Sequence, residues 1–466
     1  MSRDRIDALL WFAIPCLVFS LIPIGFASGD GVGHSLAFAS GRWHLNPNHL
    51  LFEPLGAWWQ TTLMALGYPR EPFDALKLLS ILSGSLAVGL FRLLVAPRVS
   101  ASRFAANYGT AWVALSSAFL RLWISDETHM IQMPWIVLMI WAALRRRGLL
   151  LGVMTGIATL TFVSNVLFGL ALVRRRFIPF AVGLAITTIP PLLLAWPRTT
   201  SFFSWLTRYG GGAVSPRAEQ AYGFHGLLES TLRAGYGAAC AMVDLTSRGT
   251  NPFVWGPMLA AAIVLLYALR HADREILGIV IPMSIAIAAF GIFWNDSDDQ
   301  FWFQLAPIAG MLAARLRSRA IVALGACVQL WNAGDVTLHR VFYPRAERIA
   351  MVEQAANGAC LVVTPGFDEA ELLLQISHHV TAEKLSITDL ATELSPDTGL
   401  ALLRLHVEHC LASGGRVVLI DLYDTPRDRN PWKFLRLLGY ERDAVERELS
   451  RYPACTRVTL RPSTSF

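Results

Sequence analysis

The feature that most constrains this chain is a series of long apolar runs, separated by short connections that carry most of its arginines. A helix needs about 20 apolar residues to cross the hydrocarbon core of a bilayer. Such runs recur through residue 333. With 54% apolar and only 16% charged residues, the chain is also far more apolar than a water-soluble protein. We therefore expect an α-helical polytopic membrane protein.

Two parts of this series need a topological argument. The stretch 148–173 lies between two arginine triplets, so both of its ends belong on the same side of the membrane, and it has to turn back near Ser164 and Asn165. The runs 301–314 and 320–333 are short but apolar. Counting two helices in 148–173, the sequence predicts about 11 transmembrane helices, the others lying at 8–26, 75–96, 104–124, 130–144, 177–196, 252–269 and 275–294.

The charged residues orient these helices. Arginines in short connections favour the cytoplasmic side, which places the N-terminus in the cytoplasm. The same orientation sends most carboxylates outward, so two independent residue classes agree. The net charge of +6 is therefore a topological signal, and we expect membrane lipids rather than nucleic acid as partners. The predicted location is the inner or plasma membrane of the cell.

Residues 1–333 are thus predicted to form a transmembrane domain with four outward segments. Two are long loops, 27–74 and 197–251, and two are tight turns, 125–129 and 295–300. Within the first loop, the apolar stretches His34 to Ala39 and Leu50 to Leu66 have the character of amphipathic helices that lie in the membrane interface.

The chain changes character after the last apolar run, and 340–466 reads as a small water-soluble α/β domain. Strands are expected at 359–364, 385–388, 416–422 and 456–460, with helices at 368–380, 395–413 and 442–452. This alternation favours a parallel sheet. Eleven spans would place this domain outside the cytoplasm. The sequence leaves open whether two of the three cysteines Cys360, Cys410 and Cys455 form a disulfide. Three cysteines cannot all pair.

The first outer loop holds the most suggestive polar residues. Asp30 follows the first apolar run, with His34 four residues later and His49 further along. A carboxylate and histidines at the membrane surface can carry acid–base chemistry on the headgroup of a lipid-linked substrate. Two other interpretations stay open: Asp30 caps a helix that begins at Gly31, or Asp30 and the histidines, with His44, bind a metal ion.

The turn 125–129 is a second candidate, because Asp126, Glu127 and His129 lie there between two apolar helices. Adjacent carboxylates can position an acceptor or bind a divalent cation such as Mg²⁺ or Mn²⁺, with Asp126 and Glu127 as the ligands. The alternative is that a short turn in water is simply polar, with Asp126 capping the next helix.

Four outer arginines are candidates for binding a phosphate group, because guanidinium groups bind phosphate through paired hydrogen bonds. Arg121 lies just inside the outer end of a span, where a charge is costly unless it is paired. It can hold a lipid phosphate or pair with Asp126 or Glu127. The others, in the second long loop, are Arg208, Arg217 and Arg233, and an ordinary solvated loop is the alternative interpretation there.

Taken together, these features resemble the GT-C superfamily of membrane glycosyltransferases. The resemblance covers residues 1–333: a cytoplasmic N-terminus, a long first outer loop that begins with an acidic residue, interfacial helices, and many spans followed by an outer soluble domain. A first-loop segment also resembles that of uncharacterised bacterial members, Asn46-Pro47-Asn48-His49-Leu50-Leu51-Phe52. Asp30 is followed by glycine, so the Asp-Glu pair of the protein-mannosyltransferase-like branch is absent, as is the WWDxG-like element of oligosaccharyltransferases.

The resemblance implies a function and a site. Members of the superfamily typically transfer a sugar from a polyprenyl-phosphate carrier to an acceptor on the outer face, here a lipid, a glycan or a protein. Asp30 matches the position of their first-loop catalytic residue, and Asp126-Glu127 that of a second acidic site. The implied reaction is an inverting displacement with Asp30 as general base, supported by His34, His49 and His129.

Two other function classes remain compatible with the sequence. A transporter or flippase for a lipid-linked glycan would also need outer arginines and a large apolar bundle, although such proteins often show internal repeats and ionisable groups near the middle of the membrane. The third class is a noncatalytic membrane partner that binds through its C-terminal domain. Convergence of Asp30, Asp126 and Glu127 on one place would favour the transferase.

Overall fold

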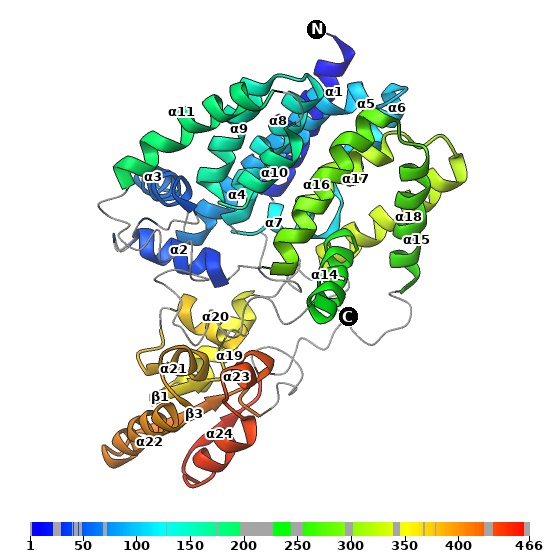
Figure 1. Cartoon of the computed structure of the whole chain (residues 1–466). Helices are drawn as coiled ribbons and strands as arrows, with labels where there is room; N and C mark the ends of the chain where they lie inside the picture. Colours follow the sequence, from blue (N-terminus) through cyan, green and yellow to red (C-terminus); the bar gives the residue numbers. More distant parts are fainter. Residues whose placement is uncertain are drawn as a thin grey trace. The chain divides into compact units, whose positions relative to one another are not determined.

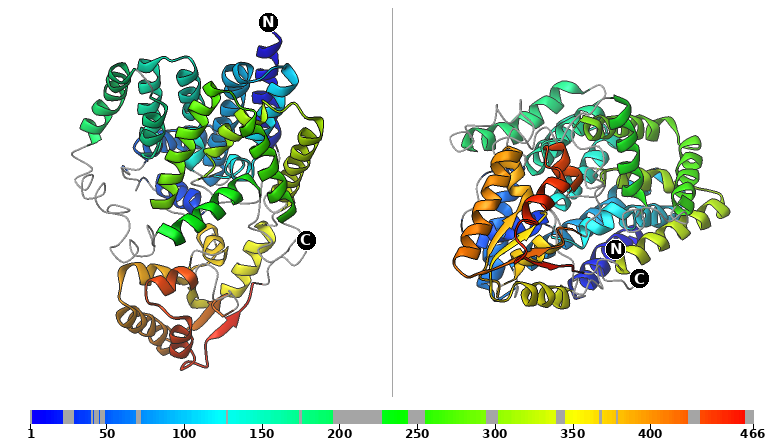
Figure 2. Two further views of the ribbon diagram at one scale, coloured as in Figure 1. Left: turned by 45° about the vertical axis from the view of Figure 1, so that its right-hand side comes forward. Right: turned by 90° about the horizontal axis from the view of Figure 1, so that it is seen from below.

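The chain folds into two compact units that divide after residue 343, and each is described by itself. Figures 1 and 2 show a helical bundle and a smaller α/β unit. The computed structural model describes residues 2–21, 29–39, 41, 45, 49–68, 72–126, 128–173, 176–195, 227–243, 255–293, 302–338, 345–366, 369–377, 379–423 and 432–460.

The first unit is built from helices that follow the apolar runs of the sequence. Its long helices are α1 (Arg3–Leu21), α4 (Pro72–Leu90), α6 (Arg103–Ala114), α7 (Ser117–Trp123), α8 (Met133–Leu144), α9 (Gly148–Thr161), α10 (Asn165–Leu172), α11 (Phe177–Ala195), α14 (Leu227–Met242), α15 (Trp255–Arg270), α16 (Arg274–Phe293), α17 (Leu305–Ala313) and α18 (Arg319–Val336). α4 continues through the π-helix η2 (Phe91–Val95) into α5 (Ala96–Val99).

Several of these helices have the length and composition of membrane spans. In the described part of the chain, Phe73–Val99, Phe177–Ala195 and Arg274–Ile292 are long and apolar enough to cross a bilayer. Three shorter apolar helices cover His129–Leu144, Gly148–Thr161 and Trp255–Arg270. The polytopic helical class is thereby confirmed, while the number of spans stays a prediction.

The predicted reversal inside 148–173 is confirmed, because α9 ends at Thr161 and α10 begins at Asn165. α9 packs closely against α11, as both views of Figure 2 allow the reader to follow. Glycines make this approach possible: a Cβ at Gly152 would lie 2.9 Å from the backbone nitrogen of Leu184, and one at Gly183 equally close to that of Val153.

Two elements differ from the sequence expectation. α14 lies inside the segment 197–251 that was expected to be a loop, and it forms because small buried residues such as Ala234 and Ala241 let it pack against α7, α16 and α17. The predicted span 301–314 yields only the nine residues of α17, from Ala306 to Ala313 all buried. A helix surrounded by other helices does not need the length that lipid contact imposes.

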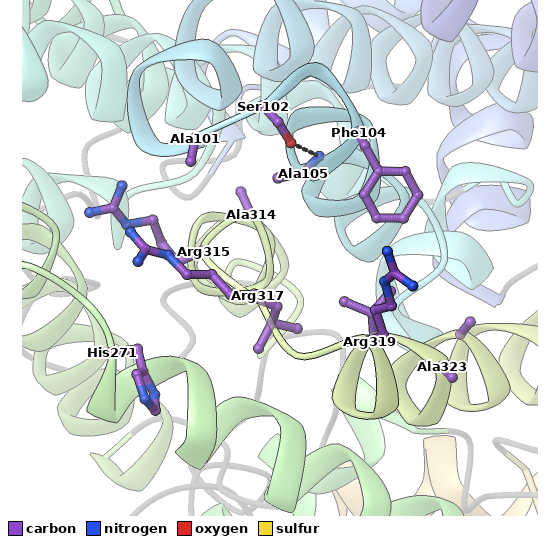
Figure 3. A pocket seen from close by; sticks show the side chains of 13 residues that line it. Ala101, Ser102, Phe104, Ala105, His271, Ala314, Arg315, Arg317, Arg319 and Ala323 are labelled. Carbon is purple, nitrogen blue, oxygen red and sulfur yellow. Dashed lines mark hydrogen bonds between the residues drawn. The ribbon is translucent and has the colours of Figure 1, made fainter.

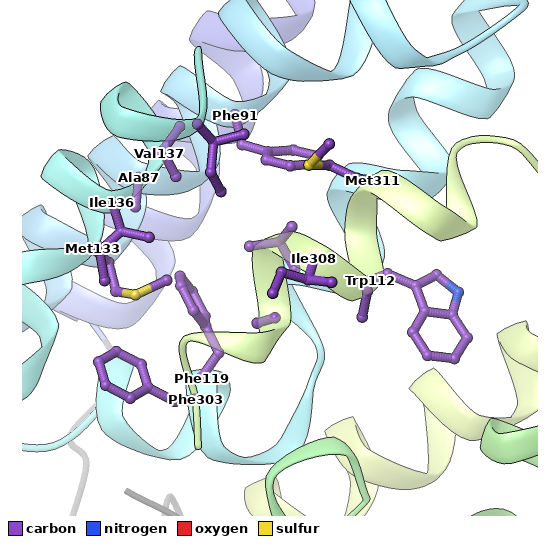
Figure 4. Packing of buried hydrophobic residues seen from close by; sticks show 14 of the residues in the cluster. Ala87, Phe91, Trp112, Phe119, Met133, Ile136, Val137, Phe303, Ile308 and Met311 are labelled. Carbon is purple, nitrogen blue, oxygen red and sulfur yellow. The ribbon is translucent and has the colours of Figure 1, made fainter. Parts of the chain in front are cut away.

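The core of the first unit is a single apolar cluster to which most of its helices contribute. Figure 4 shows side chains from α4, α7, α8 and α17 pointing into it, among them Phe119, Met133 and Ile308. Burial of this kind fixes how the helices pack. It also fixes where their polar ends meet.

The arginine-bearing ends of several helices meet in one set of polar side chains, here called the ion cluster (Asp4, Asp7, Arg92, Arg103 and Asn107). Asp7 is buried and accepts from Arg92 Nη2 at 2.6 Å and from Arg103 Nε at 2.7 Å. Arg92 is fully buried in the π-helix and also donates to Asn107 at 2.7 Å. The ion cluster therefore joins α1, η2 and α6.

At the other end of α4, the first loop folds into α2 (Gly29–Ala39) and α3 (Phe52–Ala65), as its apolar stretches predict. Phe38 and Phe52 pack with Leu76 of α4 in a separate small cluster. Two hydrogen bonds hold the pair in place: Trp59 donates to the carbonyl of Ala75, and Gln60 to that of Ser35. These helices are thus fixed to the bundle.

The second unit is a three-layer α/β unit around a parallel sheet of β1 (Ala359–Thr364), β2 (Glu383–Ser386), β3 (Arg416–Ile420) and β4 (Thr456–Val458). Their order is β2-β1-β3-β4, and all three pairings are parallel, which confirms the expectation. The second strand lies two residues earlier than predicted, because Ser386 caps α21 (Ile387–Glu393) through the backbone nitrogen of Asp389.

Helices cover both faces of this sheet (Figure 1). Leu361 of β1 and Leu419 of β3 face a core built with α21, α22 (Pro396–Ala412), α23 (Trp432–Leu437) and α24 (Arg442–Leu449). The alternate residues Val362 and Val418 are also buried, on the side of α19 (Arg345–Ala356) and α20 (Glu369–Ile376). A disulfide joins Cys360 to Cys410, with the Cα atoms 5.9 Å apart, and Cys455 is free.

Candidate functional site

The start of α2 and the turn after α7 meet at a glycine. A Cβ on Gly31 would lie 2.6 Å from Oδ2 of Asp126, so only a residue without a side chain can bring the helix so close. Asp30 precedes this glycine in the first turn of α2, which begins at Gly29 and not, as the capping interpretation expected, at Gly31. The two acidic segments predicted from the sequence therefore lie side by side in the backbone.

Histidines from three separate segments surround this meeting point. His34 lies one turn after Asp30 in α2, His49 follows in the first loop, and His129 lies in the 3-10 helix η3 (Thr128–Gln132) that leads into α8. The rings of His49 and His129 are 6.0 Å apart. With Glu53, these residues form what we call the histidine cluster.

Glu53 places a carboxylate in the histidine cluster. Its side chain is 5% exposed, and Oε1 lies 3.3 Å from Nδ1 of His34. Glu53 is in the first turn of α3, so the contact joins the two loop helices. In the sequence, Glu53 is one of the carboxylates that the predicted orientation places on the outer side, and no motif marks it. The signal that could have found it is a single acidic residue in an otherwise apolar helix.

His49 is held in a defined protonation state. Its Nδ1 lies 3.1 Å from the carbonyl oxygen of Thr161, and since a carbonyl only accepts, this nitrogen carries the proton and leaves a lone pair on Nε2. Burial, the largest effect, and the nearby His34 lower the pKa of His49 to about 4, although the bond to Thr161 favours the protonated form. His49 is thus a neutral acceptor near pH 7.

Aromatic rings and amides build the walls around the histidines. Phe162 lies 5.1 Å from the ring of His49 and 5.2 Å from that of His129, measured between ring centroids. Nearby in the chain, Asn165 donates to Gln132 at 2.8 Å. Neither Phe162 nor this amide pair was predicted, because their role depends on the reversal between α9 and α10.

The remaining predicted residues divide into three groups. Arg121 is half-buried in α7, five residues before Asp126. Arg233 lies in α14 and forms an ion pair with Glu229 one turn away. Glu127, Arg208 and Arg217 fall outside the described residues, and for Asp30 only the backbone is described. The phosphate-binding role of the arginines stays a prediction.

The metal interpretation has no support from geometry in the described part of the chain. No three His, Cys, Asp or Glu side chains among those residues gather closely enough to hold a metal ion. A site that used Glu127, His44 or the side chain of Asp30 lies outside this statement. A divalent cation therefore stays a prediction, and none of the steps below depends on it.

The chain thus combines a helical bundle, two helices of the first loop packed at one end of α4, and a separate α/β unit. No protein-family model matches the sequence. None of the curated proteins matches it.

Solved structures do match the fold of this chain. One is ArnT from Cupriavidus metallidurans bound to undecaprenyl phosphate, with a TM-score of 0.50 and 17% sequence identity over 85% of this chain and 94% of that one. The apo state of the same protein matches with a TM-score of 0.51 and 15% identity over 86% and 95% of the two chains. The chain thus shares the fold of ArnT, and the likeness extends beyond its first unit.

Proposed function

We propose that this protein is a membrane glycosyltransferase that moves a sugar from a polyprenyl-phosphate donor to an acceptor at the outer side of the bilayer. The observation that carries the proposal is the likeness in fold to ArnT, a protein crystallised with undecaprenyl phosphate, over nearly the full length of both chains. The close approach of Gly31 to Asp126 supports it, because two acidic segments with nearby histidines suit acid–base chemistry.

In the proposed reaction, the Asp30 carboxylate accepts the proton of an acceptor hydroxyl while the hydroxyl oxygen attacks the anomeric carbon. The new carbon–oxygen bond forms as the bond between the anomeric carbon and the phosphate oxygen breaks. The electron pair of the broken bond leaves with polyprenyl phosphate. Attack opposite the leaving group inverts the anomeric configuration. The reaction changes no oxidation state and needs no oxidant or reductant.

Neighbouring residues take supporting roles in this proposal. The lone pair on Nε2 of His49 can accept a hydrogen bond from a sugar or acceptor hydroxyl, and His34 and His129 lie in the same cluster. Asp126 orients the acceptor beside Asp30. Charge on the departing phosphate is neutralised by guanidinium groups, for which Arg121, Arg208, Arg217 and Arg233 are the candidates.

The test is transfer activity in purified protein reconstituted with lipids, measured as release of polyprenyl phosphate from a panel of polyprenyl-phosphate hexoses and pentoses. We expect Asp30→Asn to lower the rate by about 10²- to 10⁴-fold, the usual contribution of a general base. Asp74→Asn is the matched control, since Asp74 is also an acidic residue of the predicted first loop but pairs with Lys77 in the first turn of α4. Full activity in Asp30→Asn would rule out this role.

The competing classes give different results in the same preparation. A transferase releases polyprenyl phosphate in detergent as well as in vesicles, whereas a flippase moves its substrate only across a sealed bilayer and breaks no bond. A noncatalytic partner does neither. The anomeric configuration of the product, measured by NMR, separates inversion from retention.

We further propose that the second unit lies outside the cytoplasm. Its disulfide between Cys360 and Cys410 supports this, because disulfides persist in oxidising compartments and are rare in the cytosol. α18 also starts at the arginine-bearing end of the first unit, as a last outward span would. Thiol alkylation in intact cells tests the proposal: both cysteines should resist alkylation until reduction, and immediate labelling by a membrane-permeant reagent would contradict it.

A further inference from the structure

A cavity opens at the arginine-bearing end of the first unit, far along α6 and α7 from the histidine cluster. Its volume is about 610 Å³. Four chain segments form it: the start of α6, the end of α15, the connection from α17 to α18, and the first turns of α18. Figure 3 shows this cavity with the side chains that line it.

The polar lining of the cavity is entirely basic or neutral. Arg315, Arg317 and Arg319 line it together with His271, and no carboxylate does. Arg315 already has two protein partners, because it donates to the carbonyl of Val99 at 3.1 Å and forms an ion pair with Asp273. Arg317 and Arg319 are exposed, and within the described chain no carboxylate forms an ion pair with either. In Figure 3 the guanidinium of Arg317 lies near that of Arg315, and Arg319 lies below Phe104.

Apolar side chains line the cavity beside Arg319 (Figure 3). Phe104 is 66% exposed, and Ala105, Val322 and Ala323 continue the same surface. A water-filled site for a free anion has no need of such a wall. Guanidinium donors beside an apolar surface suit a molecule that carries both a phosphate and an acyl chain.

A second cavity at the arginine-bearing end serves as a comparison, because it is also lined by arginines but most of them contact other side chains. It measures about 510 Å³ and is lined by Arg146, Arg147 and Arg176. There Arg146 lies 3.8 Å from Glu275, and Arg147 stacks over the ring of Trp141 at 5.9 Å. Two of its three guanidinium groups thus already have partners, whereas the described residues supply no ion-pair partner to Arg317 or Arg319.

We propose that the cavity lined by Arg317 and Arg319 binds the phosphate of an anionic glycerophospholipid on the arginine-bearing side of the membrane. Arg317 and Arg319 donate to the phosphate oxygens, and the first acyl carbons pack on Phe104 and Val322. This site is separate from the candidate active site, and its occupancy does not depend on the proposed transferase activity.

The experiment uses the full chain in phosphatidylcholine nanodiscs, with binding of added phosphatidylglycerol measured by native mass spectrometry and by the shift in melting temperature. The test variant is Arg317→Gln with Arg319→Gln. The matched control is Arg3→Gln with Arg5→Gln, which removes two exposed arginines near the start of α1, outside the cavity. We expect the apparent affinity for phosphatidylglycerol to fall at least about tenfold in the test variant and to stay unchanged in the control.

Three outcomes would overturn the proposal. An equal loss in both double variants would mean diffuse attraction between the membrane and any arginine. Equal binding of phosphatidylcholine and phosphatidylglycerol would mean an apolar groove. Competition by inorganic phosphate or glycerol 3-phosphate as strong as that of the lipid would mean a site for free anions. If the double variant does not fold, the single variants and Phe104→Ala, each expected to weaken lipid binding, make the same distinctions.

Discussion

The ion cluster and the histidine cluster lie toward opposite ends of α4, and both contain buried ionisable side chains, yet their charges are balanced differently. In the ion cluster, Asp7 is shared by two guanidinium groups, so the charges satisfy each other. In the histidine cluster, the carboxylate of Glu53 lies beside the ring of His34, and burial keeps His49 neutral. Charges that satisfy each other anchor helices, whereas a neutral imidazole with a lone pair can accept a hydrogen bond from a substrate.

The largest effect on stability is expected from the ion cluster. Asp7→Asn leaves the buried Arg92 with only the exposed Asp4 as a carboxylate partner, and breaking such a pair should lower the free energy of unfolding by about 3–5 kcal/mol. Asp4→Asn removes the exposed partner and should cost about 1 kcal/mol or less. Denaturant titration of the purified protein measures both. Similar losses in the two variants would show that Asp7 is not the centre of the cluster.

The next effect concerns the contact between α2 and the turn at Asp126. Gly31→Ala introduces a methyl group into backbone contact with Asp126, which should cost about 1–3 kcal/mol and reduce transfer activity at least tenfold by displacing the start of α2. Gly33→Ala is the matched control in the same helix, because a Cβ there meets nothing within 4 Å. Its higher helix propensity should stabilise α2 by up to about 1 kcal/mol. Equal behaviour of the two variants would contradict the close approach.

A smaller effect is expected from the one ion pair in the histidine cluster. Glu53→Gln should destabilise the protein by about 1–2 kcal/mol, since it weakens a buried hydrogen-bonded contact without removing volume. A double-mutant cycle with His34→Gln isolates the contact. A coupling energy near zero would show that the two side chains do not interact in solution.

The smallest effect is a pH dependence. The pKa of His49 lies near 4 in the folded protein and near 6.5 when unfolded, so the unfolded chain binds more protons between these values. The stability that neutral His49 contributes is complete above pH 6.5 and is lost as the pH falls toward 4. Melting temperature against pH should therefore decline less steeply in His49→Gln. Parallel curves for the two proteins would show that His49 does not carry this dependence.

Much of the first unit could be predicted because its signals are local. Apolar length marked most of the helices, and the arginine triplets on either side of 148–173 required the reversal that α9 and α10 make. The same local reasoning failed for α14, whose apolar residues are small and spaced among polar ones. It also overestimated the span at 301–314, because a buried helix such as α17 is not held to the thickness of the bilayer.

The candidate site was predictable only in its parts. Asp30, His34, His49, Asp126 and His129 were named because polar groups at the ends of apolar runs are unusual, and their meeting depends on contacts far apart in the chain. His49 reaches Thr161 across 112 residues, and Glu53 was not singled out until its pairing with His34 was seen. A sequence pattern of a few residues cannot encode a contact between residues so far apart in the chain.

The sequence by itself determined that the protein is a helical membrane bundle with an α/β unit, because hydrophobicity, charge bias and the alternation of strands with helices are properties of neighbouring residues. Only the tertiary structure decided which polar residues meet. Close packing places a glycine where α2 touches Asp126, a buried aspartate between two arginines, and Arg317 and Arg319 beside apolar side chains in one cavity. These contacts follow from the way whole helices pack, which no single segment specifies.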